Sequence, residues 1–268
     1  MTELDLHGLG LGTWQNTDPE DCADSVVTAL ELGYRHIDTA QAYGNEDAVG
    51  RGLAEADVPR EEVFLATKVD TDNLAHEDVL ETAAESLDRL GVDYLDLLYV
   101  HWPTETYDAE GTLSAFQQLY DEGTIRHIGV SNFEPEHLDE AREILDAPIF
   151  ANQVEMHPSL QQAELREYAA EHGHNVVAYS PLARTDVLDD PVLQDIAAKH
   201  DASVPQVTLS WLVSLEDVAA IPKATGAEHI ADNWGAYDVD LDEEDLERIA
   251  DLDDGERQID FEGAPWDN

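Results

Sequence analysis

Four polar residues lie at or just beyond the ends of short apolar runs, where they could carry out acid–base chemistry. Lys68 ends the run 63–67, Asp38 ends another, and His101 directly follows residues 94–100. A partly buried lysine needs a counter-ion, and Asp38 is available for that role. Tyr43 lies five residues beyond Asp38. Beside an ammonium its pKa would be drawn toward neutrality, which would make the phenol a usable general acid. A neutral His101 imidazole could orient a substrate oxygen.

The elements that position these residues alternate between short apolar runs and helical patterns over almost the whole chain. Such alternation is typical of βα units with a parallel sheet. We predict eight strands at 9–13, 35–39, 63–68, 94–100, 125–130, 149–152, 175–179 and 218–222. The pattern favours a single-domain (β/α)₈ TIM barrel over residues 1–268, with the residues before Leu9 at its bottom. An open, doubly wound sheet is the alternative.

Helix boundaries can be predicted from capping residues. Asp18 and Pro19 suit the start of the first helix, and Gly33 suits its end. Cys22 fits a buried position on that helix, and it is the one cysteine of the chain, so an internal disulfide is excluded. In a barrel of this kind the active site lies where the strands end. Reactive or hydrogen-bonding side chains stand at seven successive strand ends.

Several other chemistries lack their motifs in this sequence. There is no H-E-x-x-H metal motif and no G-x-S-x-G elbow, so we expect neither a metal site nor Ser-His-Asp hydrolysis. The glycines at 8, 10 and 12 do not form a dinucleotide fingerprint, because its third glycine would fall at Thr13.

Charge composition excludes further functions. The chain has 13 Lys and Arg against 61 Asp and Glu, a formal net charge of −48, which argues against binding nucleic acid or anionic membranes. Lysine occurs only at 68, 199 and 223. An acidic surface so poor in lysine suggests a halophilic protein, because molar salt screens its self-repulsion. No membrane span or signal peptide is evident, and we expect a cytoplasmic protein.

Seven short motifs in this sequence, taken together and in order, resemble those of the aldo-keto reductases. The resemblance runs from about Gly10 to Asn233, and it points to small microbial aldehyde or diketogluconate-type reductases. The motifs are DTAQAYGNE at 38–46, the strand end at Lys68, LYVHWP at 98–103, GVSNF at 129–133, NQVEMHP at 152–158, YSPL at 179–182 and IPK at 221–223.

The resemblance implies a role for each matching residue. Tyr43 would protonate the carbonyl oxygen, Lys68 and Asp38 would lower its pKa, and His101 would position that oxygen. The nicotinamide would be held by Ser131, Asn132 and Gln153, with Tyr179 stacked on its ring. The other implied cofactor-binding residues are Gly12, Thr13, Ser180, Leu182, Lys223, His229, Asp232 and Asn233, and Trp14 and Trp102 would contact the substrate.

The resemblance leaves the cofactor and the substrate open. Lys223 matches a cation used against the 2′-phosphate of NADPH, but Ala224 and His229 replace the usual hydroxyl residue and arginine. We favour NADPH, with NADH as the alternative. The substrate could be a small aldehyde, an α-dicarbonyl or a keto-sugar, because the loop 104–110 is short and suggests an open pocket. Family resemblance favours a monomer.

Two other functions compete with reduction. Some relatives of the family hold the cofactor as regulatory modules with little turnover. A barrel aldolase would instead use Lys68 as a Schiff-base nucleophile. In that case Tyr179 and the amide residues would have no role.

Overall fold

Eight parallel strands form the centre of the computed structural model, which describes residue 6 and residues 8–267. The strands pair in sequence order, β1 with β2 and so on to β8. They are β1 (Leu11–Gly12), β2 (His36–Asp38), β3 (Phe64–Val69), β4 (Leu95–Val100), β5 (Ile125–Ser131), β6 (Ile149–Glu155), β7 (Asn175–Tyr179) and β8 (Val218–Ala220). The sheet closes because the backbone N–H of Gly10 donates to Ala220 O at 2.9 Å and that of Gly12 to Pro222 O at 3.1 Å.

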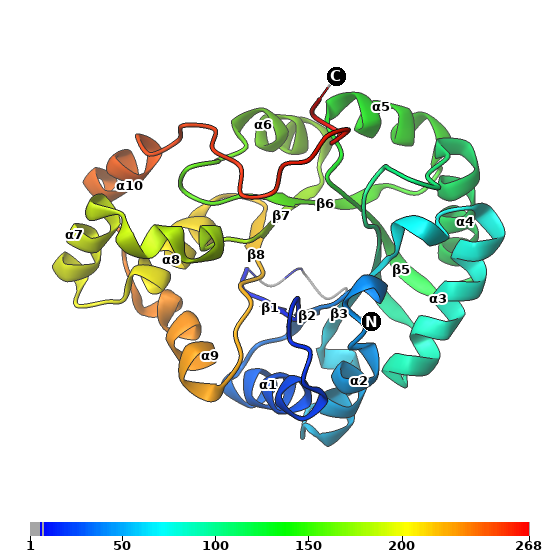
Figure 1. Cartoon of the computed structure of the whole chain (residues 1–268), viewed down its shortest axis with the longest axis horizontal. Coiled ribbons are helices and arrows are strands. Elements are labelled where there is room, and N and C mark those ends of the chain that lie inside the picture. The colour runs from blue at the N-terminus through cyan, green and yellow to red at the C-terminus, as the bar shows by residue number, and fades with distance from the viewer. Residues whose placement is uncertain (1–5, 7, 268) are drawn as a thin grey trace.

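Helices surround these strands, as Figure 1 shows. They are α1 (Pro19–Leu32), α2 (Glu46–Glu55), α3 (His76–Leu90), α4 (Ala109–Asp121), α5 (Pro135–Ile144), α6 (Ala163–His172), α7 (Pro191–His200), α8 (Val204–Ser214), α9 (Ala227–Trp234) and α10 (Glu243–Ala250). The (β/α)₈ barrel is therefore confirmed and the open sheet is excluded. We expected the residues before Leu9 to lie at the bottom of the barrel, but most of these residues are outside the described part of the chain.

The predicted capping of the first helix is confirmed. The Asp18 carboxylate accepts hydrogen bonds from the backbone N–H groups of Glu20 and Asp21, Pro19 begins α1, and Gly33 ends it with a φ of 117°. A left-handed φ of this kind favours glycine, which carries no Cβ. Cys22 is fully buried on the same helix.

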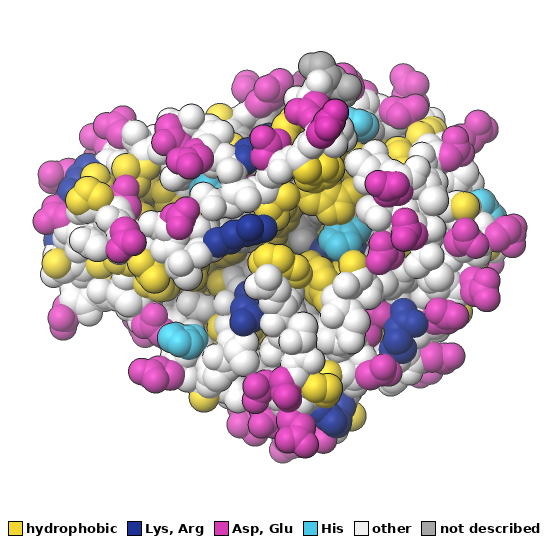
Figure 2. Space-filling model, in the orientation of Figure 1, with side chains coloured by type: hydrophobic (Ala, Val, Ile, Leu, Met, Phe, Trp, Pro, Cys, Tyr) yellow, Lys and Arg dark blue, Asp and Glu magenta, His cyan; other side chains and the backbone are white. Residues whose placement is uncertain are grey.

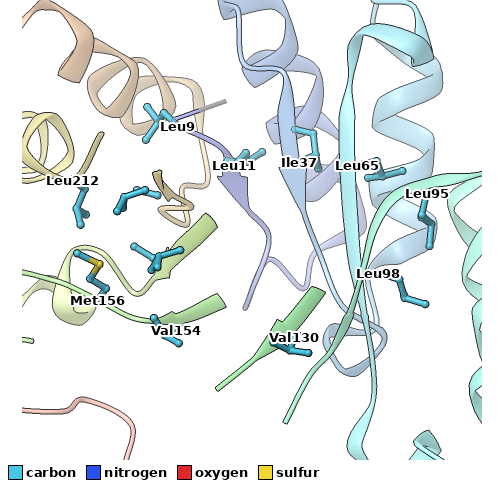
Figure 3. Packing of buried hydrophobic residues seen from close by; sticks show 14 of the residues in the cluster. Leu9, Leu11, Ile37, Leu65, Leu95, Leu98, Val130, Val154, Met156 and Leu212 are labelled. Atoms are coloured by element: carbon cyan, nitrogen blue, oxygen red, sulfur yellow. The ribbon is translucent and has the colours of Figure 1, made fainter. Parts of the chain in front are cut away.

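The core has two layers, because successive side chains of a strand point to opposite faces. Phe64, Ala66 and Leu97 pack inside the barrel. The residues between them on the strands pack outward against the helices; Figure 3 shows Leu65, Ile37 and other members of this layer. The same alternation decides which polar residues point inward where the strands end.

Candidate active site

Strand alternation places four of the predicted site residues on the inner face of the barrel. Phe64 and Ala66 point inward, so Lys68 does too, and Leu97 sets the same direction for His101. By the same rule Ala151 predicts the direction of Gln153, and Val177 that of Tyr179. Because parallel strands end at the same edge of a barrel, these side chains converge at its C-terminal mouth.

Lys68 is the centre of a buried polar cluster. Its side chain is 1% exposed, and its Nζ lies 2.5 Å from Asp38 Oδ1. It also donates to Thr39 O at 2.7 Å and to the Tyr43 hydroxyl at 3.3 Å. The second Asp38 oxygen accepts a hydrogen bond from Gln153 Nε2 at 2.8 Å. Asp38 is thus the counter-ion that a buried lysine requires.

The electrostatics of this cluster differ in one respect from the sequence-based expectation. Burial lowers the pKa of Lys68, but the interactions with Asp38 and Tyr43 together outweigh this effect, so the pKa stands above its usual value. For Tyr43, burial raises the pKa more than the Lys68 ammonium lowers it. The expectation that the phenol pKa moves toward neutrality is therefore wrong for this structure. Tyr43 is a protonated phenol held beside a permanent positive charge.

His101 lies beside the Tyr43 ring, with the two ring centroids 5.9 Å apart. Burial, and next the nearby Lys68 charge, lower the pKa of His101 to about 3. The imidazole is therefore neutral at physiological pH, as expected from the sequence. A neutral imidazole can donate one hydrogen bond without adding a second charge to the site.

A second cluster contains the predicted amide-binding residues. Asn132 donates to the backbone oxygen of His101 at 3.2 Å and to Ser131 Oγ at 3.0 Å, and it accepts from the Tyr179 hydroxyl at 2.8 Å. Its φ is 61°, a left-handed conformation that asparagine tolerates better than most residues. Ser131 Oγ in turn donates to Gln153 O at 2.8 Å. The network links β4, β5, β6 and β7 and fixes the orientation of the Tyr179 ring.

A cavity of about 580 Å³ opens over both clusters. Figure 2 shows a hollow on this face with hydrophobic and basic side chains around it, whereas acidic side chains lie mostly farther out. Of the predicted site residues, those lining the cavity are Gly12, Thr13, Trp14, Asp38, Tyr43, His101, Trp102, Ser131, Asn132, Gln153, Tyr179, Ser180, Leu182 and Lys223. Lys68 is not among the lining residues, but it contacts two of them, Tyr43 and Asp38.

Three predicted cofactor residues lie on α9, away from the lining of the cavity. His229 is exposed, Asp232 is half-buried, and Asn233 is 5% exposed. The Asp232 carboxylate accepts a hydrogen bond from Ser203 Oγ at 2.8 Å, which ties α9 to the start of α8. The structure therefore does not bring these three residues together with the buried polar cluster around Lys68.

Eight lining residues are not among the predicted site residues: Gln15, Ala42, Pro181, Arg184, Thr185, Ile221, Pro222 and Ile259. Arg184 follows β7, and its guanidinium lies 5.4 Å from the centroid of the Trp14 ring. Arg184 lies two residues after Leu182, a predicted cofactor-binding residue, and this proximity in sequence could have indicated it. Ile259 lies beyond α10, and no local pattern indicates that it reaches the mouth.

The donor set fits a nicotinamide dinucleotide. The cavity combines an aromatic face at Tyr179 with amide groups at Asn132 and Gln153. Its lining holds two basic residues, Arg184 and Lys223, in a chain with a net charge of −48. Basic side chains at an otherwise acidic surface suit phosphate groups.

These features define a (β/α)₈ barrel with a polar cavity at its mouth, and comparison with known proteins identifies the family. The profile of the Aldo/keto reductase family matches residues 8–254. An aldo-keto reductase of Mycolicibacterium smegmatis is 44% identical over 250 residues, covering 93% of this chain and 90% of the relative. The glyoxal reductase of Bacillus subtilis is 40% identical over 254 residues, covering 95% and 91%.

The structural comparison agrees. The crystal structure of a Bombyx mori aldo-keto reductase in complex with NADP superposes with a TM-score of 0.90 at 32% identity, covering 96% of this chain and 94% of that one. The chain belongs to the aldo-keto reductase family. In the described part of the chain, no helix is long and apolar enough to cross a membrane.

Proposed function

We propose that this protein reduces aldehydes and ketones to alcohols with NADPH, and that α-dicarbonyls are among its substrates. One observation carries the proposal: the Tyr43 hydroxyl lies at the wall of the cavity, 3.3 Å from a buried ammonium. A phenol beside a fixed positive charge suits protonation of an oxygen that becomes negative during the reaction. The likeness to a glyoxal reductase supports the dicarbonyl substrate class.

The cofactor supplies a hydride to the carbonyl carbon when it is bound. The chain's own residues act on the carbonyl oxygen. Tyr43 donates its proton to that oxygen as negative charge builds up, and Lys68 stabilises the phenolate left behind. Asp38 keeps Lys68 charged, and neutral His101 holds the oxygen by a hydrogen bond. Ser131, Asn132 and Gln153 line the cavity and would bind the carboxamide, and Tyr179 would stack on the nicotinamide ring.

NADPH is favoured over NADH because Lys223 and Arg184 both line the cavity. Two cations can bind a phosphate monoester that NADH lacks. The aldolase alternative is not supported by Lys68, because an ammonium paired with Asp38 at 2.5 Å is not a free amine nucleophile. The regulatory-module alternative gains no support either, because Lys68 contacts both Tyr43 and Asp38.

The test is the Tyr43→Phe variant, assayed by NADPH oxidation in molar potassium chloride with methylglyoxal. Removing a general acid lowers turnover by about 10² to 10⁴-fold, and the ring that fills the site remains. The dissociation constant for NADPH should stay within about twofold, because the proposed role of the phenol hydroxyl is toward the carbonyl oxygen. Unchanged turnover would refute the proposed role of Tyr43.

A further inference from the structure

The C-terminal segment, residues 251–267 after α10, runs back across the barrel. Figure 1 shows it passing α6 and reaching α5. Its first part is held by Ser159 O, which accepts hydrogen bonds from the backbone N–H groups of Asp254, Gly255 and Glu256 at 2.9 to 3.2 Å. The rest of the segment must be fixed by other contacts if it is to form part of the site.

Glu155 supplies those contacts from the end of β6. It lies two residues beyond Gln153 and on the same inner side of the strand, and its side chain is fully buried. One carboxylate oxygen accepts from the backbone N–H of Gln258 at 2.5 Å, and the other from that of Ile259 at 3.0 Å. His157 Nε2 lies 3.0 Å from the first oxygen.

A buried carboxylate is costly unless donors surround it, and charge-assisted hydrogen bonds to backbone N–H groups are among the strong ones. The catalytic cluster does not use this carboxylate, because no contact joins Glu155 to Tyr43, Lys68, Asp38 or His101 in the hydrogen bonds and ion pairs of the described residues. Its bonds are instead directed to the C-terminal segment.

The attached segment contributes to an apolar wall of the cavity, which includes Ile259 and Trp102. Ile259 lines the cavity directly. Phe261 and Trp266 pack on Trp102, another lining residue, with ring centroids 5.3 and 5.9 Å apart. A displacement of residues 258–259 would therefore move the apolar wall without moving Tyr43.

We propose that Glu155 is a positioning residue for substrate selection: by fixing the backbone of Gln258 and Ile259, it holds the apolar wall that larger carbonyl substrates contact. The inference rests on the proposed carbonyl reductase function. Small carbonyl substrates that reach only Tyr43 and His101 do not depend on this wall.

The first test compares methylglyoxal with phenylglyoxal, two dicarbonyls that differ in a methyl and a phenyl group. In Glu155→Gln an amide NH₂ replaces one acceptor oxygen, so one of the two backbone N–H groups loses its partner. We expect KM for phenylglyoxal to rise about tenfold, and KM for methylglyoxal and the NADPH dissociation constant to stay within about twofold. Equal changes in KM for both substrates, or no change in either KM, would overturn the proposal.

Two further variants separate positioning from general loss of structure. Glu134→Gln removes a carboxylate that meets the same segment through Arg257, at 3.8 Å, and should leave both KM values unchanged. A chain ending at Glu256 should show the same rise in KM for phenylglyoxal as Glu155→Gln does, with KM for methylglyoxal nearly unchanged. When Glu155→Gln is added to the shortened chain, the two KM values should not change further. An additional rise in KM for phenylglyoxal would show that Glu155 acts by a route other than the C-terminal segment.

A protease assay tests the attachment without any need for turnover. Trypsin can cleave after Arg257, which is half-buried and lies 3.9 Å from the centroid of the Trp266 ring. Release of the peptide 258–268, followed by mass spectrometry, should be about tenfold faster in Glu155→Gln than in the parent or in Glu134→Gln. Equal rates would refute the attachment. If the parent reduces neither dicarbonyl, the proposed function fails, and this assay still decides the role of Glu155.

Discussion

The Asp38–Lys68 pair gives the most direct test of the reasoning about the site. Both side chains are 1% exposed and their charged atoms lie 2.5 Å apart. In Asp38→Asn the ammonium keeps the neutral acceptors Thr39 O and Tyr43 Oη but loses its counter-ion. Leaving one charge of a buried pair without its partner costs about 3–5 kcal/mol in the free energy of unfolding. We expect the same range for Lys68→Met, which leaves the carboxylate with Gln153 as its hydrogen-bond donor.

The double variant Asp38→Asn/Lys68→Met should be less destabilised than the sum of the two single variants, because it leaves no unbalanced charge. The coupling energy should be about 2 kcal/mol or more. The surface pair Lys199–Asp242 is a matched control: its atoms lie 2.6 Å apart, but the side chains are 39% and 57% exposed. Its coupling should be much smaller than that of the buried pair, because solvent screens exposed charges.

Urea unfolding followed by tryptophan fluorescence, at about 1 M and about 3 M potassium chloride, measures both cycles. Salt should reduce the surface coupling and leave the buried coupling unchanged, because ions do not enter the buried site. Single variants destabilised by less than about 1 kcal/mol, or strictly additive losses at positions 38 and 68, would refute the account of the cluster.

Three further predictions follow from the site and the surface. The pKa of His101 is about 3 in the folded protein against an ordinary 6.5, so the unfolded chain binds the proton more readily and stability should fall as the pH drops below about 6.5. Urea unfolding at about pH 7 and about pH 5 should show a smaller loss for His101→Gln than for the parent, and equal losses would contradict the assignment. Lys223→Met should raise KM for NADPH about tenfold and leave KM for NADH within about twofold; parallel changes would exclude a phosphate contact. The melting temperature should rise between about 0.1 M and about 3 M potassium chloride, because salt screens a net charge of −48, and a flat curve would exclude salt adaptation.

Local sequence determined the elements and most of the site. Short apolar runs and capping signals are local, so each of the eight predicted strands matches an observed one, and Asp18 and Gly33 mark the ends of α1. Since barrel strands all end at one edge, the identity of the residue at each strand end was enough to predict that Lys68 and His101 would lie at the same mouth of the barrel.

The environment of those residues depended on the tertiary structure. The sequence showed a lysine near Tyr43 but not how completely both would be buried, so it predicted a lowered phenol pKa where the structure has a raised one. Desolvation depends on every atom packed around a group, whereas the presence of one charged neighbour can be inferred from a motif.

The cavity wall also required the tertiary structure. Glu155 and Ile259 are 104 residues apart in the chain, and their hydrogen bond forms only after β6 and the C-terminal segment have been placed on one barrel. Nothing in the local pattern around either residue predicts that contact. The sequence by itself determined which groups can perform the chemistry, and the packing of distant segments decided their ionisation and the shape of the cavity they face.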